Sequence, residues 1–174
     1  VEDMQDLTAN QQEPLDFPLT IGIIPTICPF LLPKLLPVLN HHYPNARLTI
    51  VEEQSHRLIE MVRSGEIDTA ILALPFAIDG LLSMEFWEED FYWVALKGAD
   101  HTGKKEISSK ELTQCNLMLL NDGHCLKDHI LSACNLTEKA ANQGFGATSL
   151  NTLIQMVLGN LGTTLIPQMA LDQL

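Results

Sequence analysis

The sequence predicts an α/β protein made of two small sub-domains on either side of a cleft. Its 174 residues are 46% hydrophobic and 18% charged, which suits a chain with a buried core and not a disordered one. Strand-like and helix-like segments alternate before about residue 90 and again after it. The charge changes at the same place, from a net −11 over residues 1–90 to −1 over residues 91–174. We therefore expect sub-domains over 17–90 and 91–174, preceded by a polar linker at 1–16.

The first half of the chain has the pattern strand, helix, strand, helix, strand. The expected strands are 19–24, 47–51 and 69–74, with helices between about 30 and 42 and over 56–64. Thr26 and Ser55 stand where helix N-caps are expected, and Gly65 stands where a helix stops. Pro33 and Pro37 predict a kink or a late start in the first helix. This order predicts parallel strands joined by right-handed helical crossovers.

The second half alternates as well. Strands are expected at 82–87, 91–96, 116–120 and 163–166, and helices at 108–113, 125–134, 150–158 and after Pro167. Ser108 and the pair Thr148-Ser149 are expected to cap their helices. Ligands of such α/β sheets bind at the carboxyl ends of the strands, where helix N-termini point.

Charge and composition exclude several functions. With 10 basic against 22 acidic residues, the chain lacks the basic face that direct nucleic-acid binding requires, so any DNA contact is expected through another part of a longer protein. No apolar run reaches the roughly 18 residues of a membrane helix, and no signal-peptide pattern begins the chain. Four cysteines without a CxxC pair predict neither a disulfide scaffold nor a zinc cluster. We expect a reduced, cytoplasmic protein without metal or cofactor.

The densest group of reactive side chains surrounds Cys125. His124, Lys127 and His129 lie within four residues of this cysteine, and Asp128 follows it by three. If Cys125 begins a helix, the helix dipole and these basic neighbours favour the thiolate, which is the nucleophilic form. Asp128 opposes this effect, or it serves as a proton acceptor. The alternative interpretation is an ordinary helix start with a solvated charged face.

Cys134 lies nine residues after Cys125. In a continuous helix nine residues rise ~13.5 Å, whereas a disulfide needs Cα atoms roughly 4.4–6.8 Å apart. The two thiols therefore bond only if the helix breaks. Closing such a loop constrains the unfolded segment by about 2.7 kcal/mol, which is comparable to the stability of a short docked helix. The pair thus predicts a redox-controlled bistable element, with a buried, inert helix thiol as the alternative for Cys134.

Thr26 and Ser55 are further candidates for a site. Each follows a predicted strand and precedes a predicted helix, so each is able to place a hydroxyl at the cleft. The alternative is that both residues only cap their helices.

Several segments of the chain resemble the OxyR family, the hydrogen-peroxide-sensing regulators of the LysR type. The segment LLNDGHCLKDHILSAC at 119–134, with its nine-residue cysteine spacing, is the specific part of the likeness. Three further segments carry the likeness: IGIIPTICPFLLPKLLPVL at 21–39, VEEQSHRLIEMVRSGEIDTAILAL at 51–74 and GATSLNTLIQMVLGNLGTTLIP at 146–167. Parts of the last two, SGEIDTAIL and ATSLNTL…GTTLIP, are shared more widely among LysR-type effector domains.

The resemblance implies a regulatory domain of two Rossmann-like sub-domains of the periplasmic-binding-protein type, with the C-terminal return and the upstream winged helix-turn-helix missing from this chain. Cys125 matches the cysteine that peroxide oxidises to a sulfenic acid, and Cys134 matches the one that then forms the disulfide. His124 and Asp128 match residues beside the reactive thiol. The disulfide is expected to refold the segment and alter the packing of the oligomer.

The same resemblance implies the peroxide-binding residues and the partners. Thr26 matches the threonine that contacts peroxide, and Ser55 replaces a threonine of the family while keeping its hydroxyl. The expected partners are hydrogen peroxide, a second copy of the chain (a tetramer in the full-length protein) and DNA through an absent N-terminal domain, with no membrane. Two departures stand out: Gly144 and Gly146 replace an expected His and Arg, and Cys28 replaces a small residue and competes for oxidant.

Two other functions remain open at this point. A LysR-type domain of this kind could bind a small co-inducer in its cleft while the cysteines stay inert. A thiol peroxidase would use the same cysteines but turn over many equivalents of peroxide, whereas a sensor reacts once and resets slowly.

Overall fold

The computed structural model describes residues 15–100, 103–138 and 146–173. The chain divides into two compact units, Val1–Leu72 and Ala73–Leu174. The division falls earlier than the predicted boundary near residue 90. The reason is that the segment 73–90 forms hydrogen bonds with elements of the second unit, which are described below.

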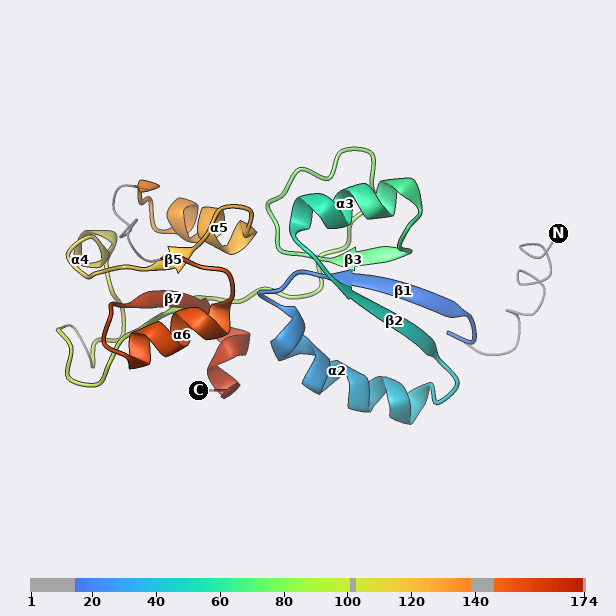
Figure 1. The fold of residues 1–174 in the computed structure, drawn as a ribbon, viewed down its shortest axis with the longest axis horizontal. Coiled ribbons are helices and arrows are strands. Elements are labelled where there is room, and N and C mark those ends of the chain that lie inside the picture. Colours follow the sequence, from blue (N-terminus) through green and yellow to red (C-terminus); the bar gives the residue numbers. More distant parts are fainter. Residues whose placement is uncertain (1–14, 101–102, 139–145, 174) are drawn as a thin grey trace. The chain divides into compact units, whose positions relative to one another are not determined.

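The first unit is a three-stranded parallel sheet with one helix on each face (Figure 1). The strand order is β2-β1-β3, and β1 pairs with β2 along its whole length, from Pro18 opposite Arg47 to Ile23 opposite Glu52. This confirms the predicted strand–helix alternation and the parallel pairing. The elements are β1 (Pro18–Ile23), α2 (Cys28–His42), β2 (Arg47–Glu52), α3 (Ser55–Ser64) and β3 (Thr69–Ile71).

Helix α2 begins early and runs through both of its internal prolines, Pro33 and Pro37. Its N-cap is Ile27, with helical backbone angles and no side-chain hydrogen bond, and the N–H of Cys28 donates to the Ile24 carbonyl at 2.9 Å. The prediction that Thr26 caps this helix is therefore wrong. A tight turn at the end of β1 already supplies the carbonyl partner that starts the helix.

Helix α3 packs closely on the sheet because β1 carries a glycine where the helix crosses. A Cβ added at Gly22 would lie 2.4 Å from Leu58 Cδ2 and 2.7 Å from Ile67 Cδ1. The N-cap of α3 is Gln54, and Ser55 is the first helical residue without a capping bond, so the predicted capping role of Ser55 is wrong. Gly65, with φ of 72°, ends the helix as predicted.

The described part of the second unit contains two short pairs of strands. The antiparallel strands β4 (Phe91–Val94) and β7 (Thr164–Pro167) pair with each other, as do the parallel strands β5 (Leu119–Leu120) and β6 (Gly146–Ala147). An isolated bridge between Leu117 and Thr163 joins the two pairs. The helices of this unit are α4 (Ser109–Leu112), α5 (Cys125–Ala133), α6 (Leu150–Leu158) and the 3-10 helix η2 (Gln168–Gln173).

The predicted helix starts of the second unit are confirmed. Ser108 forms a capping box with Glu111 ahead of α4, and the Ser149 hydroxyl accepts from the N–H of Thr152 ahead of α6. The strand expected at 82–87 is wrong. Its alternating apolar residues, among them Leu82 and Met84, are exposed, because no strand among the described residues pairs with this segment.

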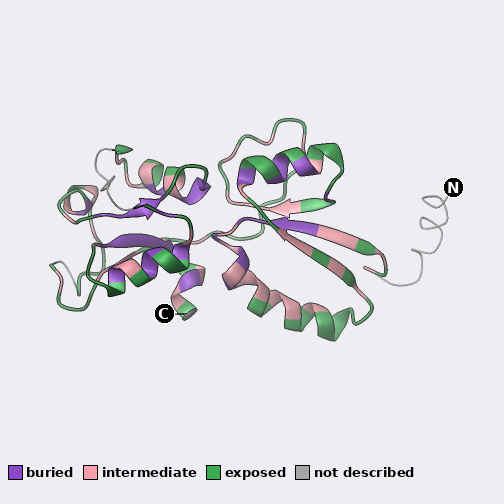
Figure 2. Ribbon diagram, in the orientation of Figure 1, coloured by how far each residue is buried: buried purple, intermediate pink, exposed green. Residues whose placement is uncertain are grey.

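Buried residues lie in β1, in β5, β6 and β7 of the second unit and on the inner helix faces, whereas β2, β3 and β4 contain none (Figure 2). In the first unit, Ile21, Ile23 and Cys28 form a small buried cluster. In the second unit, the buried side chains come from all four helices and from the strands; they include Leu112, Met118, Ile130, Leu153, Ile166 and Ala170. Within the described part of the chain, no helix is long and apolar enough to cross a membrane.

Candidate functional site

The residues predicted to form the site fall into two groups. Thr26 and Ser55 belong to the first unit, where each follows the carboxyl end of one of two neighbouring parallel strands, β1 and β2. The remaining predicted residues belong to the second unit, around α5: His124, Cys125, Asp128 and Cys134.

The two hydroxyls of the first group are buried although they are polar. Thr26 is 4% exposed and Ser55 is 2% exposed. The Oγ of Ser55 has no hydrogen-bond partner among the described residues. An unsatisfied buried hydroxyl costs about 1–3 kcal/mol. Ser55 also stands in the first turn of α3, which contains no acidic residue. This place therefore suits a small ligand with hydrogen-bonding oxygen atoms.

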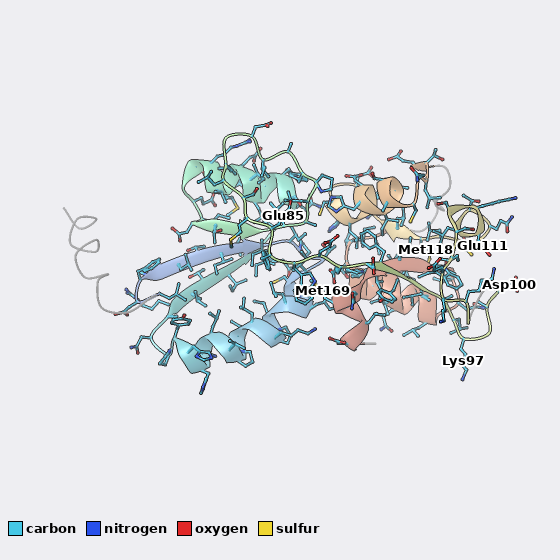
Figure 3. All side chains as sticks on the ribbon, turned by 180° about the vertical axis from the view of Figure 1, so that it is seen from behind. Glu85, Lys97, Asp100, Glu111, Met118 and Met169 are labelled. Atoms are coloured by element: carbon cyan, nitrogen blue, oxygen red, sulfur yellow. The ribbon has the colours of Figure 1, made fainter. Side chains whose placement is uncertain are left out.

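Cys28, near the same sheet edge, is a buried thiol. Burial raises its pKa to about 11, and the Glu52 carboxylate, which shares a hydrogen bond with the thiol, adds to the rise. The thiol is therefore protonated at neutral pH, which argues against the expected competition for oxidant. Cys115 has a raised pKa for similar reasons, burial first and then the charges of Glu111 and Asp100, both labelled in Figure 3.

Cys125 is the first residue of α5 and is 5% exposed. The helix starts here because the chain turns at Gly123, with φ of 94°, and His124 adopts an extended N-cap conformation. The His124 carbonyl then accepts from the N–H of Lys127 at 3.0 Å. Leu126 and Ile130 bury the inner face of the helix. The predicted placement of Cys125 at a helix N-terminus, where an anion is stabilised, is confirmed.

His124 does not supply the positive charge that the sequence suggested. Its side chain is 8% exposed, and burial lowers the pKa of the imidazole. A hydrogen bond to the backbone of Thr148 opposes this shift without cancelling it. His124 is thus a neutral, fixed imidazole at neutral pH, able to exchange a proton but not to act as a permanent counter-charge.

The Lys127 ammonium is also engaged by groups other than the Cys125 thiol. It binds Asp122 Oδ1 at 2.5 Å and Glu138 Oε1 at 3.2 Å, and these bonds raise the pKa of the lysine. Asp122 precedes α5 and Glu138 follows it, so one side chain links the two ends of the helix. Among the effects expected to favour the Cys125 thiolate, the helix N-terminus is the one that this geometry supports most directly.

The two remaining polar residues of α5 face different surroundings. Asp128 lies in the first turn and is exposed. His129 is half-buried, and its Nε2 lies 2.9 Å from the carbonyl oxygen of Pro75. No local pattern reveals this contact, because it joins residues 54 positions apart.

Cys134 closes α5 as its C-cap and is half-buried. Asn135 follows in the left-handed region with φ of 50°, and its N–H donates to the Ser132 carbonyl at 3.1 Å. The N–H of Leu136 donates to the Leu131 carbonyl at 2.8 Å, which completes a Schellman motif. Burial raises the pKa of the Cys134 thiol, so this thiol is protonated at neutral pH.

Neither cysteine of the predicted pair forms a disulfide in this structure, and α5 is intact between them. Their positions at opposite ends of the helix agree with the incompatibility between helix and disulfide derived from their spacing.

Local packing explains why residue 146 is a glycine. A Cβ at this position would lie 1.9 Å from Asn121 Oδ1, so the Asn121 side chain fills the space that any larger residue would need. Gly144, the other expected departure from the family, lies outside the described residues. Across the described ranges, no group of three or more His, Cys, Asp or Glu side chains is arranged to hold a metal ion.

Comparison with known proteins adds independent information. The LysR substrate binding domain family matches residues 13–174. The HTH-type transcriptional regulator EstR of Acinetobacter baylyi is 40% identical over 171 residues, covering 98% of this chain and 56% of EstR. A probable hydrogen peroxide-inducible genes activator of Mycobacterium leprae is 37% identical over 163 residues, covering 93% of this chain and 52% of that protein.

Solved structures agree with the sequence relatives. A cysteine-to-serine mutant of Corynebacterium glutamicum OxyR with H2O2 bound superposes with a TM-score of 0.89 at 33% identity, covering 98% of this chain and 54% of that one. The chain spans about half the length of the curated relatives that it matches. The matched family comprises LysR-type transcriptional regulators, not enzymes. The chain belongs to the LysR substrate-binding-domain family, and within that family it resembles the OxyR regulators.

Proposed function

We propose that this chain is the peroxide-sensing regulatory domain of a LysR-type transcription activator. The observation that carries the proposal is the pair of reduced cysteines at the two ends of one helix, with Cys125 at the N-terminus. The likeness to a peroxide-inducible activator and to an OxyR structure with bound H2O2 supports the same function.

The proposed reaction has two steps. The Cys125 thiolate attacks one oxygen of hydrogen peroxide, the O–O bond breaks, and the departing hydroxide takes a proton to become water. Cys125 is then a sulfenic acid. The Cys134 thiol attacks the Cys125 sulfur, an S–S bond forms, the S–OH bond breaks, and a second water leaves. Overall the two thiols lose two electrons and two protons, and peroxide is reduced to two waters.

We assign roles in the first step to the polar residues that the family resemblance implies. Thr26 and Ser55 bind and orient the peroxide through their hydroxyls, and the unpartnered Ser55 Oγ is the stronger of the two assignments. Neutral His124, or Asp128, transfers the proton to the departing hydroxide.

The second step requires α5 to unwind, because an intact helix keeps the two sulfurs apart. The Schellman motif around Asn135 and the Lys127 ion pairs oppose the unwinding. The disulfide, once formed, prevents the helix from reforming. The segment thus has two exclusive states, one for each redox condition.

The wider setting belongs to the same proposal. The chain acts as a homodimer, or as part of a tetramer in the full-length protein. It reaches DNA through an N-terminal domain outside this sequence and functions in the cytoplasm. The refolded segment changes the packing of the oligomer.

The test is mass spectrometry after one equivalent of peroxide, with Cys28→Ser as the matched control. The wild-type chain and C28S should each lose two hydrogens and contain a Cys125–Cys134 disulfide. Cys134→Ser should stop at a sulfenic acid on Cys125 that dimedone traps, and Cys125→Ser should not react. Oxidation of Cys125→Ser at the wild-type rate, or a disulfide that uses Cys28 or Cys115, would contradict the proposal.

One specific observation favours a second function, the binding of a small co-inducer. EstR, at 40% identity, is an HTH-type transcriptional regulator whose name does not refer to peroxide. A co-inducer with oxygen atoms would satisfy the Ser55 hydroxyl equally well. This function predicts that Cys125→Ser leaves ligand-induced thermal stabilisation and the transcriptional response unchanged, whereas the peroxide sensor loses its response.

A further inference from the structure

Helix α5 forms a hydrogen bond with the chain segment that enters the second unit. His129, four residues after Cys125, lies with its Nε2 2.9 Å from the carbonyl oxygen of Pro75. A carbonyl oxygen accepts hydrogen bonds and never donates, so Nε2 carries the proton and donates. Pro75 is the third residue after Leu72, the last residue of the first unit.

The segment that begins there, residues 73–90, contains no helix or strand. A turn closed by the N–H of Leu81 on the Ile78 carbonyl lies near its middle. Its far end is held by η2: the N–H of Gln168 donates to the Asp90 carbonyl at 3.1 Å. The N–H of Met169, labelled in Figure 3, donates to Glu89 Oε2 at 2.8 Å.

The two attachments of the segment have different positions relative to the cysteine pair. The attachment to η2 lies outside the 125–134 stretch that a disulfide would refold, whereas His129 lies in the middle of it. Unwinding α5 turns the His129 side chain away from its helical position, because each residue of the helix is fixed by the turn on either side. The contact with Pro75 is then lost while the contacts at residues 89 and 90 persist.

We propose that His129 transmits the redox state of α5 to the segment 73–90. In the reduced chain His129 holds the beginning of the segment through Pro75. When Cys125 and Cys134 give up two electrons and two protons to peroxide and form a disulfide, that hold is released. The inference rests on the proposed function, because it requires the disulfide to form. It adds that the His129–Pro75 contact is where the change in α5 reaches another part of the chain.

Hydrogen exchange of the backbone amides at residues 76–81, in the reduced and the peroxide-treated full chain, tests the inference. The Leu81 amide, which donates to the Ile78 carbonyl, should exchange about fivefold faster in the oxidised wild type, as expected when the turn loses one supporting hydrogen bond. His129→Ala should show the raised rate already in the reduced state and change no further on oxidation. A peptide from α2, in the other unit, serves as the internal reference.

His129→Gln is the matched control, because its side-chain amide nitrogen is able to take the place of Nε2 and donate to Pro75. It should exchange like the wild type in both states. His129→Asn, whose amide is shorter, should behave like His129→Ala. Mass spectrometry of the same samples should find the Cys125–Cys134 disulfide in all four proteins.

The outcomes separate the two ideas. A wild-type chain that forms no disulfide overturns both the proposed function and this inference. A chain that forms the disulfide but leaves exchange at 76–81 unchanged overturns the inference alone. Equal exchange in reduced His129→Ala and reduced wild type also overturns it, since the contact would then hold nothing in place.

Discussion

Cys125 and Cys134 occupy the first position and the C-cap of the same helix. The helix that separates them is nine residues long and contains the contacts of Lys127 and His129. Any change in the stability of this helix therefore changes how readily the two sulfurs meet. If the proposed disulfide forms, its formation should therefore be sensitive to ordinary helix-capping residues.

Asn135→Ala should favour the disulfide. Asn135 has a φ of 50°, a conformation in which alanine is less stable than asparagine by about 1 kcal/mol, so the reduced helix is weakened. The equilibrium constant for disulfide formation in a glutathione redox buffer should rise about fivefold. Asn135→Gly should leave it unchanged or lower it, because glycine accepts this conformation freely.

Asn160→Ala is the control for that prediction. Asn160 closes α6 with a φ of 60° and a similar Schellman pattern, but it lies outside the cysteine pair. Its substitution should lower the free energy of unfolding by a similar amount without moving the glutathione equilibrium. A shift of that equilibrium in Asn160→Ala would mean that general instability, and not α5, controls the disulfide.

The buried His124 should make the fold sensitive to mild acid. Its pKa is lowered in the folded state, so the unfolded chain binds more protons, and stability falls as the pH drops through the ordinary histidine pKa near 6.5. Denaturant unfolding at pH 7.5 and pH 5.5 measures the loss. His124→Gln should lose less stability over this interval than the wild type. An unchanged pH dependence in His124→Gln would show that the imidazole titrates alike in the folded and unfolded states.

Glu52→Gln should lower the pKa of Cys28 from about 11 without restoring an ordinary value. The carboxylate contributes to the rise, but burial contributes more and remains in the variant. Thiolate absorbance near 240 nm, followed across alkaline pH in a chain whose other cysteines are replaced by serine, measures the shift. Glu53→Gln, an exposed neighbour, should leave the titration where it is.

Gly146→Ala should destabilise the second unit by about 1–3 kcal/mol, because its Cβ would overlap Asn121 Oδ1 at the β5–β6 pair. Truncating the Asn121 side chain tests this explanation. The double variant Gly146→Ala with Asn121→Ala should recover part of the loss, so the two substitutions should be non-additive in denaturant unfolding. Strict additivity would show that glycine is needed there for some other reason.

Local patterns in the sequence predicted most of the fold. The parallel strand–helix alternation, the stop at Gly65, the caps at Ser108 and Ser149 and the helix start at Cys125 depend on a few neighbouring residues, and all are confirmed. The strand expected at 82–87 failed because alternation describes a residue pattern, whereas a strand also needs a partner.

The site was less accessible to sequence reasoning. The spacing of Cys125 and Cys134 was informative because helix geometry depends only on residue count. The electrostatic surroundings were not, since the partners that neutralise Lys127 and keep His124 uncharged become visible only in the folded chain. The His129–Pro75 bond is a long-range contact without any local signature. The roles given to Thr26, Ser55, His124 and Asp128 stay predictions.

The exposed side chains of Leu82, Met84, Phe86 and Trp87 have a consequence for handling the chain in solution. Exposed apolar side chains promote self-association, and electrostatic repulsion between strongly anionic molecules counteracts it. With a net charge of −12 and an isoelectric point near 4.7, this chain should remain dispersed at neutral pH and low salt. Turbidity should appear as the buffer approaches the isoelectric point or as added salt screens the repulsion.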